Sequence, residues 1–279
     1  MQESRFRRIM RSKPIQLFAI SLLVFIITTI VRPGWLNAPN IRLLLNMSVI
    51  TGIFVCGFSP LLMSGALDFA GTSIGVICSL FFGMMLNAGI PWPIAVILAL
   101  AIGGLFGLMN AFFVVKLNLM AFIATMAVGT VLMGVGSWIT NNIQIMITAD
   151  GFNRLSLIWV ANIIPFWFIF LGVVTAAYTI MLMKTRFGRS VVMCGGNQAA
   201  ARLAGLNPKK IRTILFINSG AVSALAGLVW SSQNRMAVPG MGGMAANMPH
   251  FQAFIASILG GVSFFGGSGS LVGAFSVRF

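Results

Sequence analysis

Acidic residues are almost absent from this 279-residue chain, which has only Glu3, Asp68 and Asp150. It also has a single histidine, His250. Acid–base pairs, metal centres and Ser-His-Asp triads each need several carboxylate or imidazole groups in one place. We therefore expect no catalytic residue, no metal site and no cofactor, and this argues against an enzyme.

Cysteine is scarce as well, with Cys56, Cys78 and Cys194 at unrelated spacings. This odd number predicts neither a disulfide framework nor a metal site. The shortage of acids leaves a net charge of +15, which at first suggests a nucleic-acid partner. The basic residues are, however, spread over loops and termini instead of lining one face with aromatics, so we expect no nucleic-acid binding.

Charged residues of either sign make up only 8% of the chain, 58% is hydrophobic, and the mean hydropathy is +1.00. Soluble domains carry about 25% charged residues, so this chain could not cover a water-facing surface. Its apolar runs are too long and too uniform for the alternating strands of a membrane barrel. The composition predicts an all-α polytopic membrane protein, with 1–279 forming one transmembrane domain in the lipid bilayer.

About 20 apolar residues cross a bilayer core. On that measure we expect about eight spans, near 14–31, 43–63, 69–88, 92–115, 119–140, 160–183, 213–230 and 250–265. The 1–13 segment is a basic head; a signal peptide is the alternative, but the apolar run after it is longer than a usual signal core. If successive spans cross the membrane in alternating directions, the head, the turn at Lys116 and the 184–212 loop share one side and carry thirteen basic residues. The opposite side carries four. The positive-inside rule then makes the N-terminus cytoplasmic.

Three polar residues stand inside apolar sequence. Asp68 lies where the chain must turn between two spans, so it either belongs to a functional path or caps the next helix through 69–71. Asn110 and Thr125 either line a path or hydrogen-bond between helices. The pairs Gly71 with Gly75 and Gly103 with Gly107 have the spacing that allows close helix packing in lipid.

The polar 184–212 segment carries seven basic residues between two spans. Asn197 is a good N-cap, 198–204 is rich in alanine, and Gly205 suits the left-handed position that ends a helix. Pro208 prevents the helix from continuing. The pattern predicts a short capped helix, either a docking surface for a soluble partner or a merely solvated loop. The other long connection, 231–249, is rich in glycine and proline and is predicted to be irregular and mobile.

Four segments in order resemble the permease subunit of ribose-type ATP-binding-cassette sugar importers. SGALDFAGTS at 64–73 is similar to SGGIDLSVGS of that family, and Asn110, Lys116 and AFIATMAVGT at 121–130 are similar to N-G…K…PFIATLGT. TRFGRSVVMCGGNQAAARLAGL at 185–206 resembles its ATPase-docking loop, and AFIASILGGVSFFGGSGSLVG at 253–273 resembles its glycine-rich segment.

The resemblance implies a bacterial inner-membrane importer with about ten spans per permease. The implied partners are an ATP-binding subunit, a second permease chain (identical or different) and a periplasmic sugar-binding protein. Path candidates are Asp68, Asn110 and Thr125. The matching loop residues implied to dock the ATPase, whose action would drive alternating access, are Gly188, Arg189, Gly196, Asn197, Ala200, Arg202 and Gly205.

The sequence departs from the family pattern at two places. Ala66, Ala70, Gly71 and Thr72 replace the family's residues around Asp68, so the cargo can differ from ribose. The family also continues through further spans beyond the position of Phe279, which makes a truncated, non-transporting permease the alternative. A third possibility is an ion-coupled secondary transporter, which needs acidic or histidine groups within the membrane and has only Asp68 available.

Overall fold

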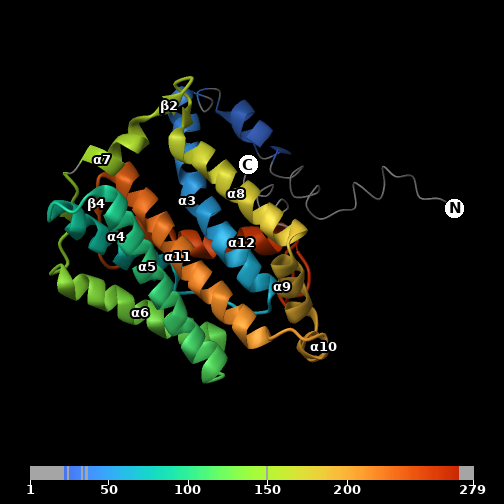
Figure 1. Cartoon of the computed structure of the whole chain (residues 1–279). Helices are drawn as coiled ribbons and strands as arrows, with labels where there is room; N and C mark the ends of the chain where they lie inside the picture. Colours follow the sequence, from blue (N-terminus) through green and yellow to red (C-terminus); the bar gives the residue numbers. More distant parts are fainter. Residues whose placement is uncertain (1–21, 24, 33, 35–36, 149, 270–279) are drawn as a thin grey trace.

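The computed structural model describes residues 22–23, 25–32, 34, 37–148 and 150–269, and most of these residues are helical. Within that part, five helices are long and apolar enough to cross a membrane. They are α3 (Ala38–Met63), α5 (Trp92–Ala111) with its continuation η1 (Phe112–Lys116), α6 (Ala121–Ile139), α8 (Phe166–Lys184) and α11 (Pro208–Asn234). The chain is therefore an all-α membrane protein, as its composition predicts (Figure 1).

The remaining elements are shorter. α4 (Gly71–Asn87) is a 17-residue apolar helix. The other short helices are α7 (Asp150–Asn153), η2 (Arg154–Leu157), α9 (Arg186–Gly196), α10 (Gln198–Leu203), η3 (Gly243–Asn247) and α12 (Pro249–Leu259). Two antiparallel pairs of short strands complete the described part: β1 (Ile145–Met146) with β4 (Met236–Ala237), and β2 (Trp159–Val160) with β3 (Ile164–Pro165).

Local sequence explains where the two longest helices begin. Asn37 accepts a hydrogen bond from the Asn40 N–H at 2.9 Å, and Asn207 accepts one from the Lys210 N–H at 3.1 Å. Each asparagine is the N-cap of a helix with proline in its first turn, where the missing N–H costs nothing. α11 ends at Asn234, and the next residue, Arg235, has a left-handed φ of 54°.

α11 is the central helix and packs against α3, α4 and α5 (Figure 1). Glycines allow its backbone to approach its neighbours closely. A Cβ on Gly220 would lie 2.2 Å from the Gly103 carbonyl oxygen, and one on Gly227 would lie 2.0 Å from that of Gly75. The predicted packing role is thus confirmed for Gly75 and Gly103, which meet partners on a helix far along the chain.

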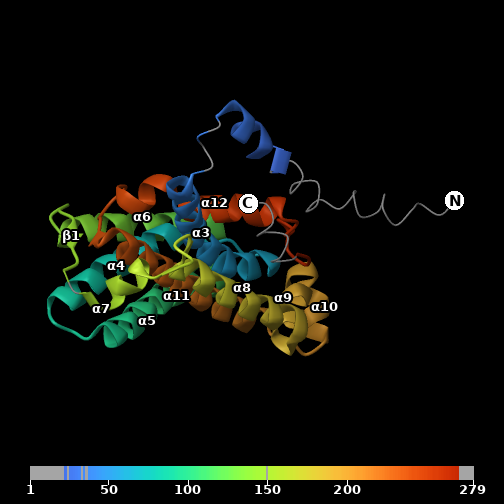
Figure 2. The same cartoon turned by 90° about the horizontal axis from the view of Figure 1, so that it is seen from above.

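The other helices are arranged around this centre. α8 and α12 pack on α3, and α4 lies between α5 and α6 (Figure 2). α9 and α10 lie at one end of the bundle, near the start of α11, while β1, β4 and α7 lie at its other end (Figure 1). The core between the helices is filled by apolar side chains such as Phe54, Phe58, Phe82 and Phe216.

The predicted spans 43–63, 92–115, 119–140, 160–183 and 213–230 overlap the five long helices, and 69–88 overlaps the shorter α4, so the described residues do not confirm the expected count of about eight. Half of the predicted span 14–31 lies outside the described residues, and its described residues, 22–23 and 25–31, are helical. The predicted span 250–265 is wrong in its second half, because α12 ends at Leu259 and Gly261 takes a left-handed φ of 93°. The 231–249 connection is partly regular, since it contains β4 and η3.

Gly220→Ala should destabilise the folded protein, because the new methyl group must push apart the backbones of α11 and α5. Overpacking of this kind costs about 1–3 kcal/mol, so we expect a lower melting temperature in detergent, measured by size-exclusion chromatography after heating. Gly172→Ala is the matched control, since a Cβ there meets nothing within 4 Å. Equal melting temperatures for the two variants would contradict the close packing.

Candidate translocation site

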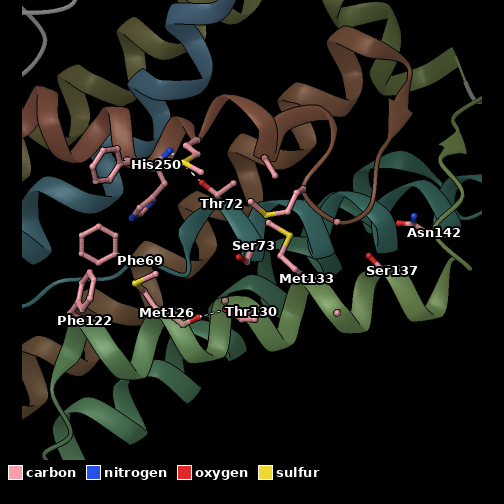
Figure 3. Close-up of a pocket in the computed structure, with 17 residues that line it drawn as sticks. Phe69, Thr72, Ser73, Phe122, Met126, Thr130, Met133, Ser137, Asn142 and His250 are labelled. Atoms are coloured by element: carbon pink, nitrogen blue, oxygen red, sulfur yellow. Dashed lines mark hydrogen bonds between the residues drawn. The ribbon is translucent and has the colours of Figure 1, made fainter.

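A cavity of about 800 Å³ lies between α4, α6 and the segment that joins β4 to α12 (Figure 3). Its walls come from three parts of the chain that are far apart in sequence. The lining residues are Phe69, Thr72, Ser73, Phe122, Met126, Gly129, Thr130, Met133, Gly134, Ser137, Asn142, Gly240, Met241, Ala245, Met248, His250 and Phe251. Small-molecule pockets commonly measure about 300–1,000 Å³, so the cavity has the volume of such a site.

The chemistry of the cavity changes along its length. Phe69 and Phe122 stand at one end, edge to face with ring centroids 5.2 Å apart, whereas Ser137 and Asn142 lie at the other end (Figure 3). The wall between them is mainly apolar, with the hydroxyl groups of Ser73 and Thr130. None of the lining residues carries a carboxylate, lysine or arginine side chain. The cavity therefore suits a small uncharged molecule with both hydroxyl and apolar faces.

Behind one wall of the cavity, the Asp68 carboxylate is completely buried and hydrogen-bonded at both oxygens. Oδ1 accepts from the Ala70 N–H at 3.0 Å and from the Asn110 amide at 3.1 Å. Oδ2 accepts from the Ser219 hydroxyl at 2.9 Å. Asp68 thereby joins the start of α4 to α5 and α11.

Thr125 and His250 hold the main chain of the same turn. Thr125 accepts from the Phe69 N–H at 3.0 Å, and the His250 Nε2 atom hydrogen-bonds to the Asp68 carbonyl oxygen. The imidazole fits only because Gly71 has no side chain, since a Cβ there would lie 2.0 Å from Nδ1. The rings of Phe54 and Phe58 meet the imidazole edge to face.

The three path candidates predicted from sequence thus lie in one buried cluster with Ser219 and His250. Their side chains have no exposed surface, and they are not among the residues that line the cavity. Of the cluster, only His250 reaches the lining. Asp68 also bonds to the N–H just before α4, as the capping interpretation predicted. Sequence reasoning missed His250 and Ser219, although a lone histidine in an apolar chain was a usable signal.

The predicted helix in the 184–212 segment is present as α10. Asn197 accepts from the N–H groups of Ala199 and Ala200 at 2.9 and 3.0 Å, and Gly205 has the expected left-handed φ of 79°. Leu203 on this helix is 92% exposed, which is unusual for a leucine.

The other predicted docking residues fall into two groups. Gly188 serves packing, since a Cβ there would lie 2.1 Å from the Leu182 carbonyl oxygen. The remaining predicted docking residues are exposed to solvent; they are Arg189, Gly196, Asn197, Ala200, Arg202 and Gly205. Nearby, burial raises the pKa of the Cys194 thiol, and the Arg212 charge partly offsets the rise.

The long apolar helices define a membrane-embedded protein, with a cavity of small-molecule size between α4 and α6 and an exposed polar end. The family model described as the permease component of branched-chain amino acid transport systems matches residues 40–279, and the chain belongs to that permease family. The family resemblance predicted from the motifs is confirmed at this level.

Relatives with assigned functions are also import permeases. The autoinducer 2 import system permease protein of Photorhabdus luminescens is 29% identical over 91% of this chain and 75% of its own length. The ribose import permease protein of Haemophilus influenzae is 29% identical over 91% of this chain and 79% of its own. The ribose import permease protein of Escherichia coli is 30% identical over 92% of this chain and 79% of its own. No solved structure matches the chain.

Asp68→Ala should destabilise the fold, because it leaves the Asn110 amide and the Ala70 N–H buried without a partner. Each unsatisfied group costs about 1–3 kcal/mol, so we expect a melting temperature in detergent that is lower by several degrees. Asp68→Asn is the control, since its amide keeps one oxygen acceptor and can donate to Ser219. If Asp68→Ala melted like the parent chain, these bonds would contribute nothing to stability.

Proposed function

We propose that this chain is the membrane-spanning subunit of an ATP-driven importer in a bacterial inner membrane, carrying a sugar or a related small uncharged molecule. Its partners would be an ATP-binding subunit, a second permease chain and a periplasmic binding protein. Transport would follow alternating access, with the cavity forming part of the path. The pairing of an exposed, capped α10 at one end with a cavity between helices carries this proposal.

The chemistry of the cavity supports an uncharged cargo. Sugars and furanose signals present hydroxyl groups on some faces and C–H groups on others. Ser73, Ser137 and Asn142 offer hydrogen bonds, while Phe69 and Phe122 offer apolar ring surface. The similarity to ribose and autoinducer 2 permeases points to the same class of cargo.

The exposed surface of α10 supports docking of a soluble partner. A solvated helix gains nothing from an outward leucine, whereas Leu203 could insert into an apolar pocket of an ATP-binding subunit. The neighbouring Arg202 is exposed and could pair with acidic groups at the rim of that pocket. Asn197 and Gly205 fix both ends of the helix, so its contact surface is preformed.

An ion-coupled mechanism receives less support from the same geometry. Coupling needs an ionisable group that exchanges its ion with water. Asp68 is fully buried and its two oxygens accept three hydrogen bonds, so an ion would have to break this cluster to reach it.

Gly134→Phe should block transport without unfolding the protein. Gly134 lines the cavity and a Cβ there meets nothing within 4 Å, so the phenyl ring can occupy the open space. We expect uptake of labelled ribose or autoinducer 2 in proteoliposomes, with both partner proteins present, to fall at least about tenfold, an apparent cost of 1.4 kcal/mol.

Gly172→Phe is the matched control for this block, because Gly172 also has open space around it but lies on α8, away from the cavity. Uptake by this control should equal that of the parent chain. Normal uptake by Gly134→Phe would remove the cavity from the path. Lack of uptake by the parent chain for every cargo in the class would favour a non-transporting permease.

Gly205→Val should weaken binding of the ATP-binding subunit. A β-branched residue is strained at a φ of 79°, so the end of α10 must unwind or shift. Copurification with the ATP-binding subunit should fall, and Leu203→Glu should have the same effect by charging the contact. Lys209→Gln, an exposed change on the next helix, should leave copurification intact. Undiminished binding by both test variants would exclude docking through α10.

A further inference from the structure

The C-terminal end of α3 is a meeting point for three segments that are far apart in sequence. The Met63 carbonyl oxygen accepts a hydrogen bond from the Gly267 N–H at 2.9 Å. A Cβ on Gly195, at the end of α9, would lie 1.9 Å from the same oxygen, and a Cβ on Gly266 would lie 2.8 Å from the Gly65 nitrogen. We call Gly65, Gly195, Gly266 and Gly267 the glycine junction. Its backbones are in direct contact, so none can move without displacing another.

Arg212, near the start of α11, completes this contact. Its Nε and Nη2 atoms donate to the Ser64 carbonyl oxygen at 3.1 and 2.9 Å, and Nη2 also reaches the Gly65 carbonyl oxygen at 3.4 Å. Ser64 is the C-cap of α3, where carbonyl groups lack helical partners and a cation is favourable. The guanidinium fork therefore fastens the end of α3 to the start of α11.

The same guanidinium also contacts α10. With the Gln198 amide oriented so that its oxygen faces Arg212, this oxygen accepts from Nη1 at 3.0 Å and from Nη2 at 2.8 Å. Gln198 is the first residue of α10. One side chain thus links the exposed helix to the end of α3.

The turn that Arg212 holds leads directly to the cavity. The connector between α3 and α4 is the segment 64–70. Its first residues bind Arg212, and near its other end Phe69 lines the cavity while Asp68 anchors the buried cluster. Only four residues lie between Ser64 and Phe69, so a shift at one end must be taken up within a short, hydrogen-bonded segment.

We propose that Arg212, supported by the glycine junction, is the positioning residue that transmits movement of α10 to the connector and thereby to the cavity wall at Phe69. This role rests on the proposed function, because the movement would come from a partner bound to α10. A residue that merely caps α3 would contribute to stability alone. A transmitting residue must also affect how the cavity and the partner respond to each other.

Arg212→Gln tests this role in the complete complex with the ATP-binding subunit and the binding protein in lipid. We expect the variant to retain copurification and basal ATP hydrolysis. Stimulation of hydrolysis by cargo-loaded binding protein, and cargo moved per ATP, should each fall roughly 5-fold or more, the usual size of a coupling effect. Lys209→Gln is the matched control, since it removes a charge from the same helical turn without touching α3.

Gln198→Ala provides a second test that does not depend on folding, because Gln198 is exposed. It should show the same loss of stimulation, and the double variant should be no worse than Arg212→Gln alone, as expected for two members of one link. Hydrogen exchange of residues 66–70 should respond to ATP binding in the parent complex but not in either variant.

Two results would overturn the inference. In the first, Arg212→Gln has a lower melting temperature, while Gln198→Ala keeps the full stimulation of ATP hydrolysis by the cargo-loaded binding protein. Arg212 would then only cap α3. The other is an exchange response in 66–70 that both variants retain. If the parent chain itself failed to bind the ATP-binding subunit, the proposed function would fail first and this role with it.

Discussion

The break in the helical backbone between α3 and α4 is the constraint on which the rest of the structure depends. Buried main-chain polar groups outside a helix must find partners, and in a membrane protein these have to come from other parts of the chain. Here the Met63 carbonyl is bonded by Gly267, the Ser64 carbonyl by Arg212 and the Phe69 N–H by Thr125. The Asp68 carbonyl is bonded by His250, and the Ala70 N–H by the Asp68 carboxylate. The hydrogen-bonding groups of one short turn thus find their partners only because α6, α11, α12 and the loop that contains Gly267 pack around it.

That requirement also determines what the turn can do. Since it is bonded on all sides, it is a poor candidate for a freely moving loop, and its residues are held in fixed positions relative to α11. The cavity wall at Phe69 and the exposed end of the bundle near α10 are therefore connected through well-defined hydrogen bonds. Glycines at the helix contacts have the complementary role, because they let α11 approach α4 and α5 closely enough for Ser219 to reach Asp68.

Sequence patterns predicted features that depend on local chemistry. The N-cap at Asn197, the left-handed Gly205 and the bond from Asp68 to the start of the next helix each involve residues within a few positions of one another. Long-range partners were not predictable, because His250 and Arg212 act on a turn more than 140 positions away. The extent of α12 was also missed: hydropathy continues past Leu259, but Gly260 and Gly261 end the helix, which only backbone conformation reveals.

The burial of Asp68 also bears on whether transport would be driven by an ion that binds this carboxylate or by a conformational change. Among the side chains that the structure describes, Asp68 is the one carboxylate within the helical bundle, and its oxygens are occupied by three donors. If an ion broke those bonds, several buried polar groups would lose their hydrogen-bond partners, and each such group costs about 1–3 kcal/mol of stability. A conformational change driven from outside avoids this cost, because the cluster can move as a unit with α4 and α11. Under the proposed function, this change would start at the exposed α10, which Arg212 links to that unit.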